Sequence, residues 1–196
     1  MNLPNKLTLS RLVLTLIFVI VIFADFPHAA TLALVLFSVA SLTDYFDGRI
    51  ARRDKLITNF GILMDPLADK IMICSAFIAF VGVDWLPAWM AVVVVARELA
   101  ITGLRLLAAS KNVVLAAERF GKDKTISQIV AVISIFVLKS YEQWDGPGRV
   151  IFGWHIGDKA WVEWFTEIAI WAAVILTFVS GWLYLWKNRR LYLDDM

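Results

Sequence analysis

Apolar residues along the chain gather into six runs that are separated by short polar stretches. The runs cover residues 12–24, 29–42, 71–83, 86–96, 126–138 and 168–186. A helix that crosses a membrane needs about 20 mostly apolar residues, and only the last run approaches that length by itself. The others reach it only if neighbouring polar and charged residues join the same helices.

Three such extensions decide which charged residues would lie inside helices. The second helix would continue through Asp44 and Asp47, and the third would begin near Gly61. The fourth would continue past Arg97 to Arg105. Short apolar segments with charged extensions indicate a cavity that opens on one face of a membrane.

Composition agrees with a membrane protein rather than a soluble one. Of the 196 residues, 60% are hydrophobic and 18% are charged, whereas soluble domains have about 45–50% apolar and about 25% charged residues. We predict an all-α, polytopic membrane protein with six transmembrane helices and a short N-terminal interfacial amphipathic segment. We expect a single membrane-embedded domain over residues 1–196, since no internal repeat is visible.

The basic residues predict an orientation. With both termini in the cytoplasm, all of the 19 Lys and Arg residues except Lys139, Arg149 and Lys159 fall on the cytoplasmic side. This excess matches the positive-inside pattern. We therefore expect a multi-pass protein of the cell (inner, cytoplasmic) membrane with its active site on the cytoplasmic side. His28 and His155 then fall outside, as loop or interface residues.

Candidate chemistry rests on carboxylates and basic groups. Cys74 is the only cysteine, which excludes an internal disulfide and a thiolate metal site, and its apolar surroundings predict a buried, inert thiol. The net charge of +2 says little about partners. A lipid bilayer is expected as the surroundings, and no nucleic acid is expected.

Four aspartates stand at helical spacing around the connection between the second and third helices. Asp44 and Asp47 would share one helix face, as would Asp65 and Asp69. The connection is short, so we predict antiparallel neighbours whose acidic faces meet. Converging carboxylates suit a hard divalent ion bound together with substrate phosphate.

An ordinary cytoplasmic loop is the alternative for residues 44–55. That alternative fails for Asp65 and Asp69, because the third helix must begin near Gly61 to cross the membrane. Ionisable groups inside a spanning helix are costly and usually functional.

One motif resembles the signature of the CDP-alcohol phosphatidyltransferase family without a departure: Asp44-x2-Asp47-Gly48-x2-Ala51-Arg52, then Gly61-x3-Asp65-x3-Asp69. The resemblance implies transfer of a phosphatidyl group from CDP-diacylglycerol to an alcohol, with release of CMP. Residues 5–11, 97–105 and 121–125 resemble members whose acceptor is glycerol 3-phosphate. The family resemblance also implies a homodimer.

The resemblance further implies a role for each motif position. Two divalent metals, Mg²⁺ or Mn²⁺, would be bound by Asp44, Asp47, Asp65 and Asp69. Asp69 would also be the catalytic base that deprotonates the acceptor hydroxyl. The CDP moiety would be held by Asp44, Gly48, Ala51, Arg52 and Gly61.

Basic residues on the fourth and fifth helices predict a site for the phosphate of the acceptor. Arg97 and Arg105 lie about two helical turns apart and so roughly on one face, and two lysines begin the fifth helix. The predicted acceptor-phosphate residues are Thr8, Arg11, Arg97, Arg105, Lys122 and Lys124.

Structural alternatives remain for most of this set. For Arg105 and the two lysines, the alternative is snorkelling or attraction to lipid headgroups. For Thr8 and Arg11, it is a plain amphipathic helix. Arg97 lies deeper, and we do not expect Glu98 to account for it, because adjacent helical residues do not share a face.

Other functions stay open at this point. The same chemistry could use inositol phosphate, serine or phosphatidylglycerol as the acceptor; the basic residues favour a phosphorylated acceptor without separating glycerol phosphate from inositol phosphate. A divalent-cation transporter that uses the four aspartates as an ion path is a different class. It is less favoured, because the acids lie towards the cytoplasmic end and no repeat is visible.

Overall fold

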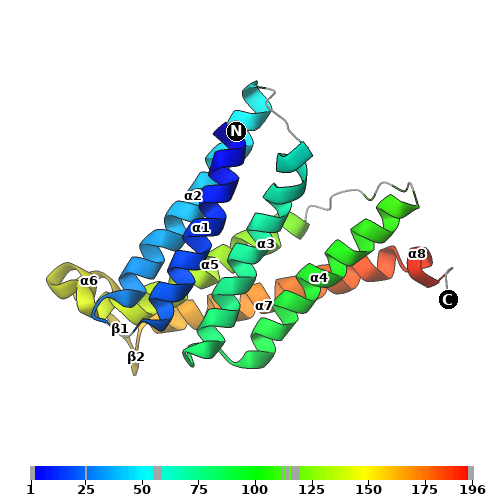
Figure 1. The fold of residues 1–196 in the computed structure, drawn as a ribbon. Coiled ribbons are helices and arrows are strands. Elements are labelled where there is room, and N and C mark those ends of the chain that lie inside the picture. The colour runs from blue at the N-terminus through cyan, green and yellow to red at the C-terminus, as the bar shows by residue number, and fades with distance from the viewer. Residues whose placement is uncertain are drawn as a thin grey trace.

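In the computed structural model, the described residues are 3–24, 26–54, 59–111, 113, 115 and 120–193. Long helices dominate them, and Figure 1 shows their arrangement. The elements are α1 (Leu3–Phe23), α2 (Ala29–Asp54), α3 (Asn59–Gly82), α4 (Ala88–Ser110), α5 (Phe120–Ser140), η1 (Tyr141–Trp144), α6 (Asp145–Phe152), β1 (His155–Ile156), β2 (Lys159–Ala160), α7 (Trp161–Lys187) and α8 (Arg190–Leu193). The predicted all-α class is confirmed, apart from the short β1–β2 hairpin.

Charged residues extend the helices as the sequence predicted. Helix α2 continues through Asp44 and Asp47 before it ends at Asp54. Helix α3 begins at Asn59, close to Gly61, and α4 continues past Arg105 to Ser110. The helices that contain the candidate site are therefore longer than their apolar runs.

Among the described residues, three helices are long and apolar enough to cross a membrane. These segments are Lys6–Phe23, Asp123–Trp144 and Trp161–Lys187, and α2 contains a shorter apolar segment, Ala29–Thr43. The expected N-terminal amphipathic segment is not a separate element, because α1 runs as one helix from Leu3 to Phe23.

The connection between α5 and α7 contains regular structure although Gly146, Pro147 and Gly148 are turn-forming residues. It forms η1, α6 and the hairpin. Pro147 lies in the first turn of α6, where its missing N–H costs no helical hydrogen bond. The indole Nε1 of Trp144 donates to Thr31 Oγ1 at 2.8 Å and ties this segment to α2.

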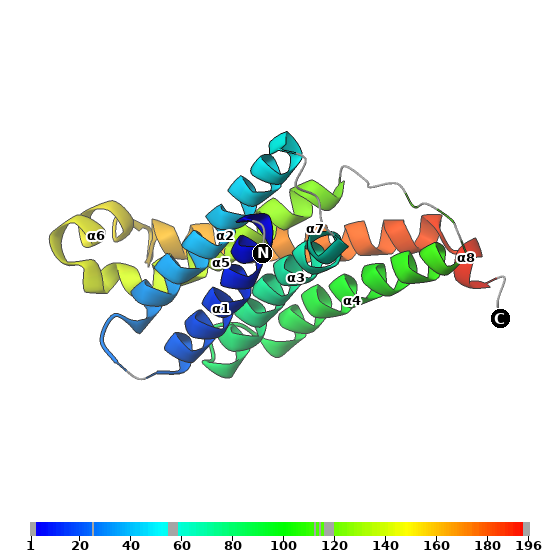
Figure 2. The same ribbon diagram turned by 45° about the horizontal axis from the view of Figure 1, so that its top comes forward.

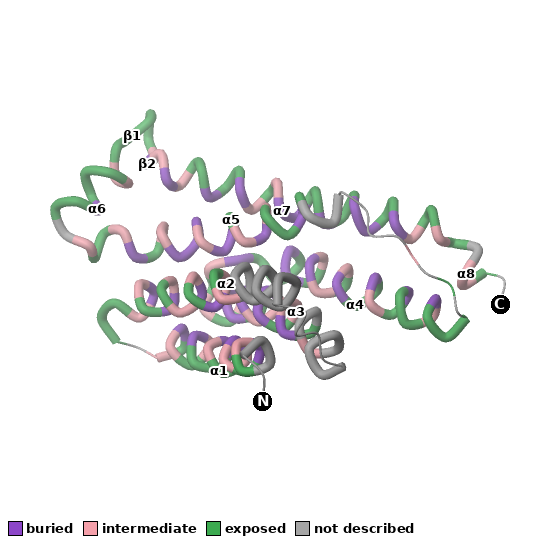
Figure 3. The backbone as a smooth tube through the Cα atoms, turned by 90° about the horizontal axis from the view of Figure 1, so that it is seen from above, coloured by how far each residue is buried: buried purple, intermediate pink, exposed green. Residues whose placement is uncertain are grey.

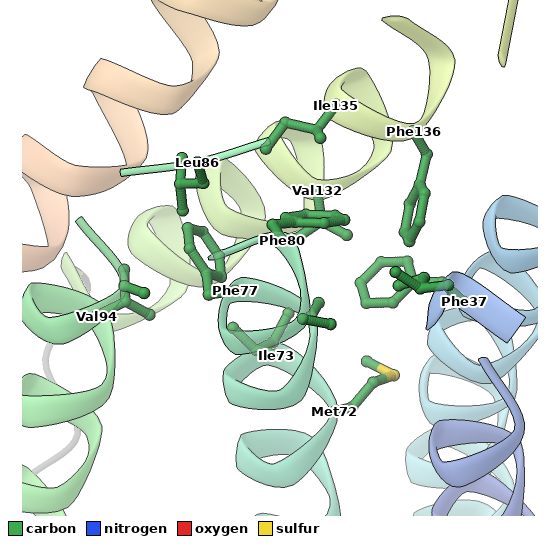
Figure 4. Close-up of a cluster of buried hydrophobic side chains, with 14 of the residues drawn as sticks. Phe37, Met72, Ile73, Phe77, Phe80, Leu86, Val94, Val132, Ile135 and Phe136 are labelled. Carbon is green, nitrogen blue, oxygen red and sulfur yellow. The ribbon is translucent and has the colours of Figure 1, made fainter. Parts of the chain in front are cut away.

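An aromatic core lies where α1, α2, α3 and α5 meet. Phe18 and Phe37 pack edge to face with ring centroids 5.9 Å apart, and Phe80 and Phe136 do so at 4.9 Å. Figure 4 shows Phe77 among the same buried side chains. Edge-to-face pairs of buried rings add to the stabilisation that burial gives.

Large apolar side chains also cover much of the outer surface. On α7, Trp171, Phe178, Trp182 and Trp186 are all exposed, and Figure 3 shows exposed and buried positions alternating along this helix. Apolar surface of this extent is unusual on a soluble monomer. Contact with lipid, or with a second copy of the chain, would account for it.

Helix α1 packs against both α2 and α3, whereas α4 and α7 pack against each other (Figures 1 and 2). Helices α2 and α3 run antiparallel, as predicted, but among the described residues they pack mainly on α1 rather than on each other as neighbours. The start of α1 lies at the same end as the end of α2 and the start of α3 (Figure 1). The prediction that the acidic faces of α2 and α3 meet concerns side chains outside the described part of the structure.

Candidate functional site

The predicted aspartate motif lies on two helices. Its first half is on α2 and its second half is on α3, as the spacing required. Asp69 is the motif acid whose side chain the structure describes. The predicted site residues whose side chains fall outside the described part are Asp44, Asp47, Gly48, Ala51, Arg52, Gly61, Asp65 and Lys122.

Asp69 forms an ion pair with Arg11 of α1. Arg11 Nη1 donates to Asp69 Oδ1 at 2.6 Å; the Arg11 side chain is 1% exposed and that of Asp69 is 45% exposed. Thr8, one turn before Arg11, is buried as well. We predicted both α1 residues for the acceptor phosphate, but the structure places Arg11 on the last acid of the motif. The pair orients the Asp69 carboxylate from a second helix.

A second charged cluster surrounds Glu98, which is buried on α4. Lys124 Nζ of α5 donates to Glu98 Oε1, and Arg97 Nη1 donates to the same oxygen at 3.3 Å. Our expectation that Glu98 would not engage Arg97 is therefore wrong. Adjacent residues point to different faces, but the arginine side chain is long enough to bend back around the helix.

Lys70 of α3 joins this cluster through Thr102. Lys70 Nζ donates to Thr102 Oγ1 at 2.5 Å, and Thr102 Oγ1 donates to the Glu98 backbone carbonyl at 2.6 Å. Lys70 also interacts electrostatically with Glu98 and Arg97. It follows Asp69 directly in the sequence, so α3 connects the aspartate motif to the cluster. We define the buried cationic cluster as Lys70, Arg97, Glu98 and Lys124, of which Glu98 and Lys124 are buried and Lys70 and Arg97 are half-buried.

Both predicted α4 arginines contact α7, which confirms that they share one face. The aliphatic part of Arg97 lies against Gly181. Arg105 lies over the ring of Tyr184, with its Cζ 5.9 Å from the centroid and its Nε 3.5 Å from the hydroxyl. Arg105 is exposed, whereas the Arg97 side chain is only 13% exposed. Arg97 is therefore the deeper member of the pair.

Polar contacts continue from the cluster along α5. Gln128, one turn after Lys124, is buried, and its Nε2 donates to Thr177 Oγ1 of α7 at 2.9 Å. Cys74, one turn after Lys70 on α3, is half-buried rather than fully buried as we expected. The cluster therefore has polar neighbours on both α5 and α7.

The charges of the cluster do not balance. Lys70, Arg97 and Lys124 supply three positive charges and Glu98 supplies one negative charge, which leaves an excess of two. Buried charge is costly unless it is paired. A phosphate monoester carries about −1.5 to −2 charges at neutral pH and accepts charge-assisted hydrogen bonds from lysine and arginine. The cluster therefore has the charge to bind one such group.

Comparison with known proteins identifies the family. The chain matches the CDP-alcohol phosphatidyltransferase family over residues 1–179. The chain belongs to this family. The resemblance inferred from the aspartate motif is thereby confirmed, and phosphatidyltransferases of this family generally depend on divalent cations.

Individual phosphatidyltransferases are similar over nearly their whole length. The chain is 40% identical to the CDP-diacylglycerol–glycerol-3-phosphate 3-phosphatidyltransferase of Bacillus subtilis (strain 168), over 95% of each chain. It is 43% identical to a probable phosphatidylglycerophosphate synthase of Mycobacterium tuberculosis (strain CDC 1551 / Oshkosh), over 96% of this chain and 82% of that protein. It is 33% identical to a further CDP-diacylglycerol–glycerol-3-phosphate 3-phosphatidyltransferase, from Rickettsia felis, over 97% of each.

Sequence reasoning missed Glu98, Lys70 and Gly181 in this phosphatidyltransferase. Lys70 had a usable signal, because it lies in a helix that the sequence predicts to span the membrane, where an ionisable residue is usually functional. Glu98 had the same signal, but we set it aside on helical geometry. Gly181 had none, since its importance depends on a contact with another helix.

Proposed function

We propose that this phosphatidyltransferase transfers the phosphatidyl group from CDP-diacylglycerol to glycerol 3-phosphate and releases phosphatidylglycerol phosphate and CMP. The observation that carries this proposal is the position of the buried cationic cluster, whose Lys70 directly follows Asp69 on α3. A site with two excess positive charges, which begins one residue after the acid of the motif on α3, suits an acceptor that has both a phosphate and a hydroxyl. The names of the relatives agree with this acceptor.

In this proposal, the motif binds the donor. The oxygen ligands of Asp44, Asp47, Asp65 and Asp69 would hold two divalent cations, Mg²⁺ or Mn²⁺, because hard cations of this type prefer carboxylates. Those cations would neutralise charge on the diphosphate. Asp44, Gly48, Ala51, Arg52 and Gly61 would hold the CDP moiety.

Asp69 and the cluster would act on the acceptor. Arg97 and Lys124 would bind its phosphate, with Lys70 as an added ligand, and Thr8, Arg11, Arg105 and Lys122 remain in the proposed set. Asp69 would accept the proton of the acceptor hydroxyl at a carboxylate oxygen. The acceptor oxygen would then bond to the phosphorus of the phosphatidyl group, and CMP would leave with the electron pair of the broken P–O bond.

We further propose that residues 1–196 form one membrane domain with six spans, in a homodimer. Both termini and the site would face the cytoplasm, in the cell's inner membrane. The basic residues near the α2–α3 junction and beyond α7 support this orientation. Exposed apolar side chains along α1 and α7 support contact with lipid or with a second copy.

An acceptor competition tests the proposed function. Purified protein in lipid vesicles would receive CDP-diacylglycerol, Mg²⁺ and equal concentrations of glycerol 3-phosphate, inositol phosphate and serine. We expect CMP release with phosphatidylglycerol phosphate as the main lipid product. Preferential use of serine or of inositol phosphate would overturn the choice of acceptor and keep the chemistry. Metal flux without any lipid product would favour a transporter.

A further inference from the structure

Helix α7 leaves room for Arg97 at a single glycine. A Cβ atom built on Gly181 would lie 2.7 Å from Arg97 Cγ, 3.6 Å from its Cβ and 3.9 Å from its Cδ. Cβ contacts under 3.0 Å are essentially never found in real proteins. Any larger residue at this position would therefore force the arginine to move.

The atom that would have to move is near the base of the arginine. Cγ is set by the first side-chain torsion, so a shift there swings the whole guanidinium rather than only its tip. The neighbouring turns of α7 offer less freedom, because Thr177 is fully buried and is held by Gln128. The missing side chain at Gly181 therefore leaves the space in which the Arg97 side chain lies when it contacts Glu98.

Glu98 fixes the other end of the same side chain. It accepts hydrogen bonds from Arg97 Nη1 and from Lys124 Nζ. Arg97 Nε is buried and has no acceptor among the residues that the structure describes. One guanidinium edge is thus held by protein, while a buried N–H donor lies within a cluster that has excess positive charge. That combination suits an anionic ligand.

We infer that Gly181 and Glu98 are positioning residues, which hold Arg97 and Lys124 in the geometry that binds the phosphate of the acceptor. This inference rests on the proposed function for the identity of the acceptor. Gly181 acts sterically from α7, and Glu98 acts through hydrogen bonds from α4. Neither residue needs to touch the substrate.

Two substitutions would disturb the positions of Arg97 and Lys124 without changing the charge of the cluster. Gly181→Ala places a methyl group against Arg97 Cγ, and Glu98→Asp withdraws the carboxylate from Arg97 and Lys124 by one methylene. Both leave the net charge of the cluster unchanged. We expect each to raise the KM for glycerol 3-phosphate by about tenfold, the effect of one lost hydrogen bond to a charged group. The KM for CDP-diacylglycerol should stay within about twofold of wild type on the same reasoning.

Gly103→Ala is the matched control. Gly103 lies on α4 beyond Arg97, and a Cβ atom added to it meets nothing within 4 Å. This variant should keep both KM values. Unchanged KM for glycerol 3-phosphate in Gly181→Ala and Glu98→Asp would overturn the inference, as would an equal rise in both KM values. If Gly181→Ala does not fold, Glu98→Asp alone decides.

A binding readout separates this inference from the proposed function. Inorganic phosphate should raise the thermal unfolding midpoint of the detergent-solubilised wild type, because a ligand that binds only the folded state stabilises it. Gly181→Ala should need about tenfold more phosphate for the same shift, and Gly103→Ala should need no more than wild type. This pattern supports the inference even if glycerol 3-phosphate is not the acceptor. No phosphate effect in wild type, or equal effects in all three proteins, contradicts it.

Discussion

Helix α5 belongs to two regions with opposite chemistry. Its first turns present Lys124 and Gln128 to polar partners on α4 and α7. Its later turns present Val132 and Phe136 to the aromatic core formed with α1, α2 and α3 (Figure 4). All four of these side chains are buried. The difference lies in what each half gains from burial.

Burial of the apolar half of α5 stabilises the fold, whereas burial of its polar half fixes the positions of polar and charged side chains. Buried aromatic contacts contribute directly to the free energy of unfolding. A buried ion pair contributes little net stability, because the cost of removing both charges from water offsets their attraction. The contacts of Glu98 with Lys124 and Arg97 are therefore better explained by a need to hold these two basic side chains in place than by a need to stabilise the fold. Substitutions in the two regions should affect different measurements.

The largest expected effect is at the polar end, on turnover. Asp69→Asn removes the proposed proton acceptor while preserving size. We expect kcat to fall by about 1,000-fold, within the range for loss of a general base, and the thermal midpoint to fall as well, because the buried Arg11 side chain no longer faces a charged carboxylate at position 69. Asp84→Asn is the control: Asp84 is exposed in the α3–α4 connection at φ 56°, where asparagine is also tolerated. Wild-type kcat in Asp69→Asn would remove Asp69 from the base role.

The next effect is at the apolar end, on stability. Phe136→Ala deletes a ring that packs against Phe80 at 4.9 Å and Phe37 at 6.1 Å. Loss of the contacts and the resulting cavity should lower the free energy of unfolding by about 3 kcal/mol, without changing the KM for either substrate. Phe178→Ala, at an exposed α7 position, should cost much less. A raised KM with unchanged stability would contradict the division between the regions.

The smallest expected effect is a loss of stability at Thr177, near the boundary between the two regions. Thr177→Val removes the hydroxyl that accepts a hydrogen bond from Gln128. Hydrogen bonds between membrane helices contribute about 0.6 kcal/mol on average, and the buried amide loses its partner as well. We therefore expect a loss of about 1 kcal/mol in thermal or chemical unfolding. Stability equal to wild type would show that the amide finds another acceptor.

The extents of the helices were predicted well from the sequence. Helical spacing and run length correctly extended α2 through Asp47, started α3 near Gly61 and extended α4 to Arg105. These features are local, since they depend on residues within a few turns of one another. The apolar runs likewise predicted which segments of α5 and α7 would be helical.

Contacts between distant segments could not be predicted. Arg11 and Asp69 are separated by 58 positions, and no periodicity relates them. Glu98 was set aside because backbone geometry separates it from Arg97, but a long side chain overcomes that separation. Helix α6 could not be read from its residues either, because Gly146, Pro147 and Gly148 suggest a turn, although Pro147 is tolerated in a first helical turn.

The most direct test of the central claim is the effect of Lys124→Gln on the two Michaelis constants. The glutamine amide can still donate a hydrogen bond to Glu98, so the substitution removes mainly the charge. If the cluster binds the acceptor phosphate, the KM for glycerol 3-phosphate should rise about tenfold or more, while the KM for CDP-diacylglycerol stays unchanged. An unchanged KM for glycerol 3-phosphate, or a rise only for CDP-diacylglycerol, would contradict the account.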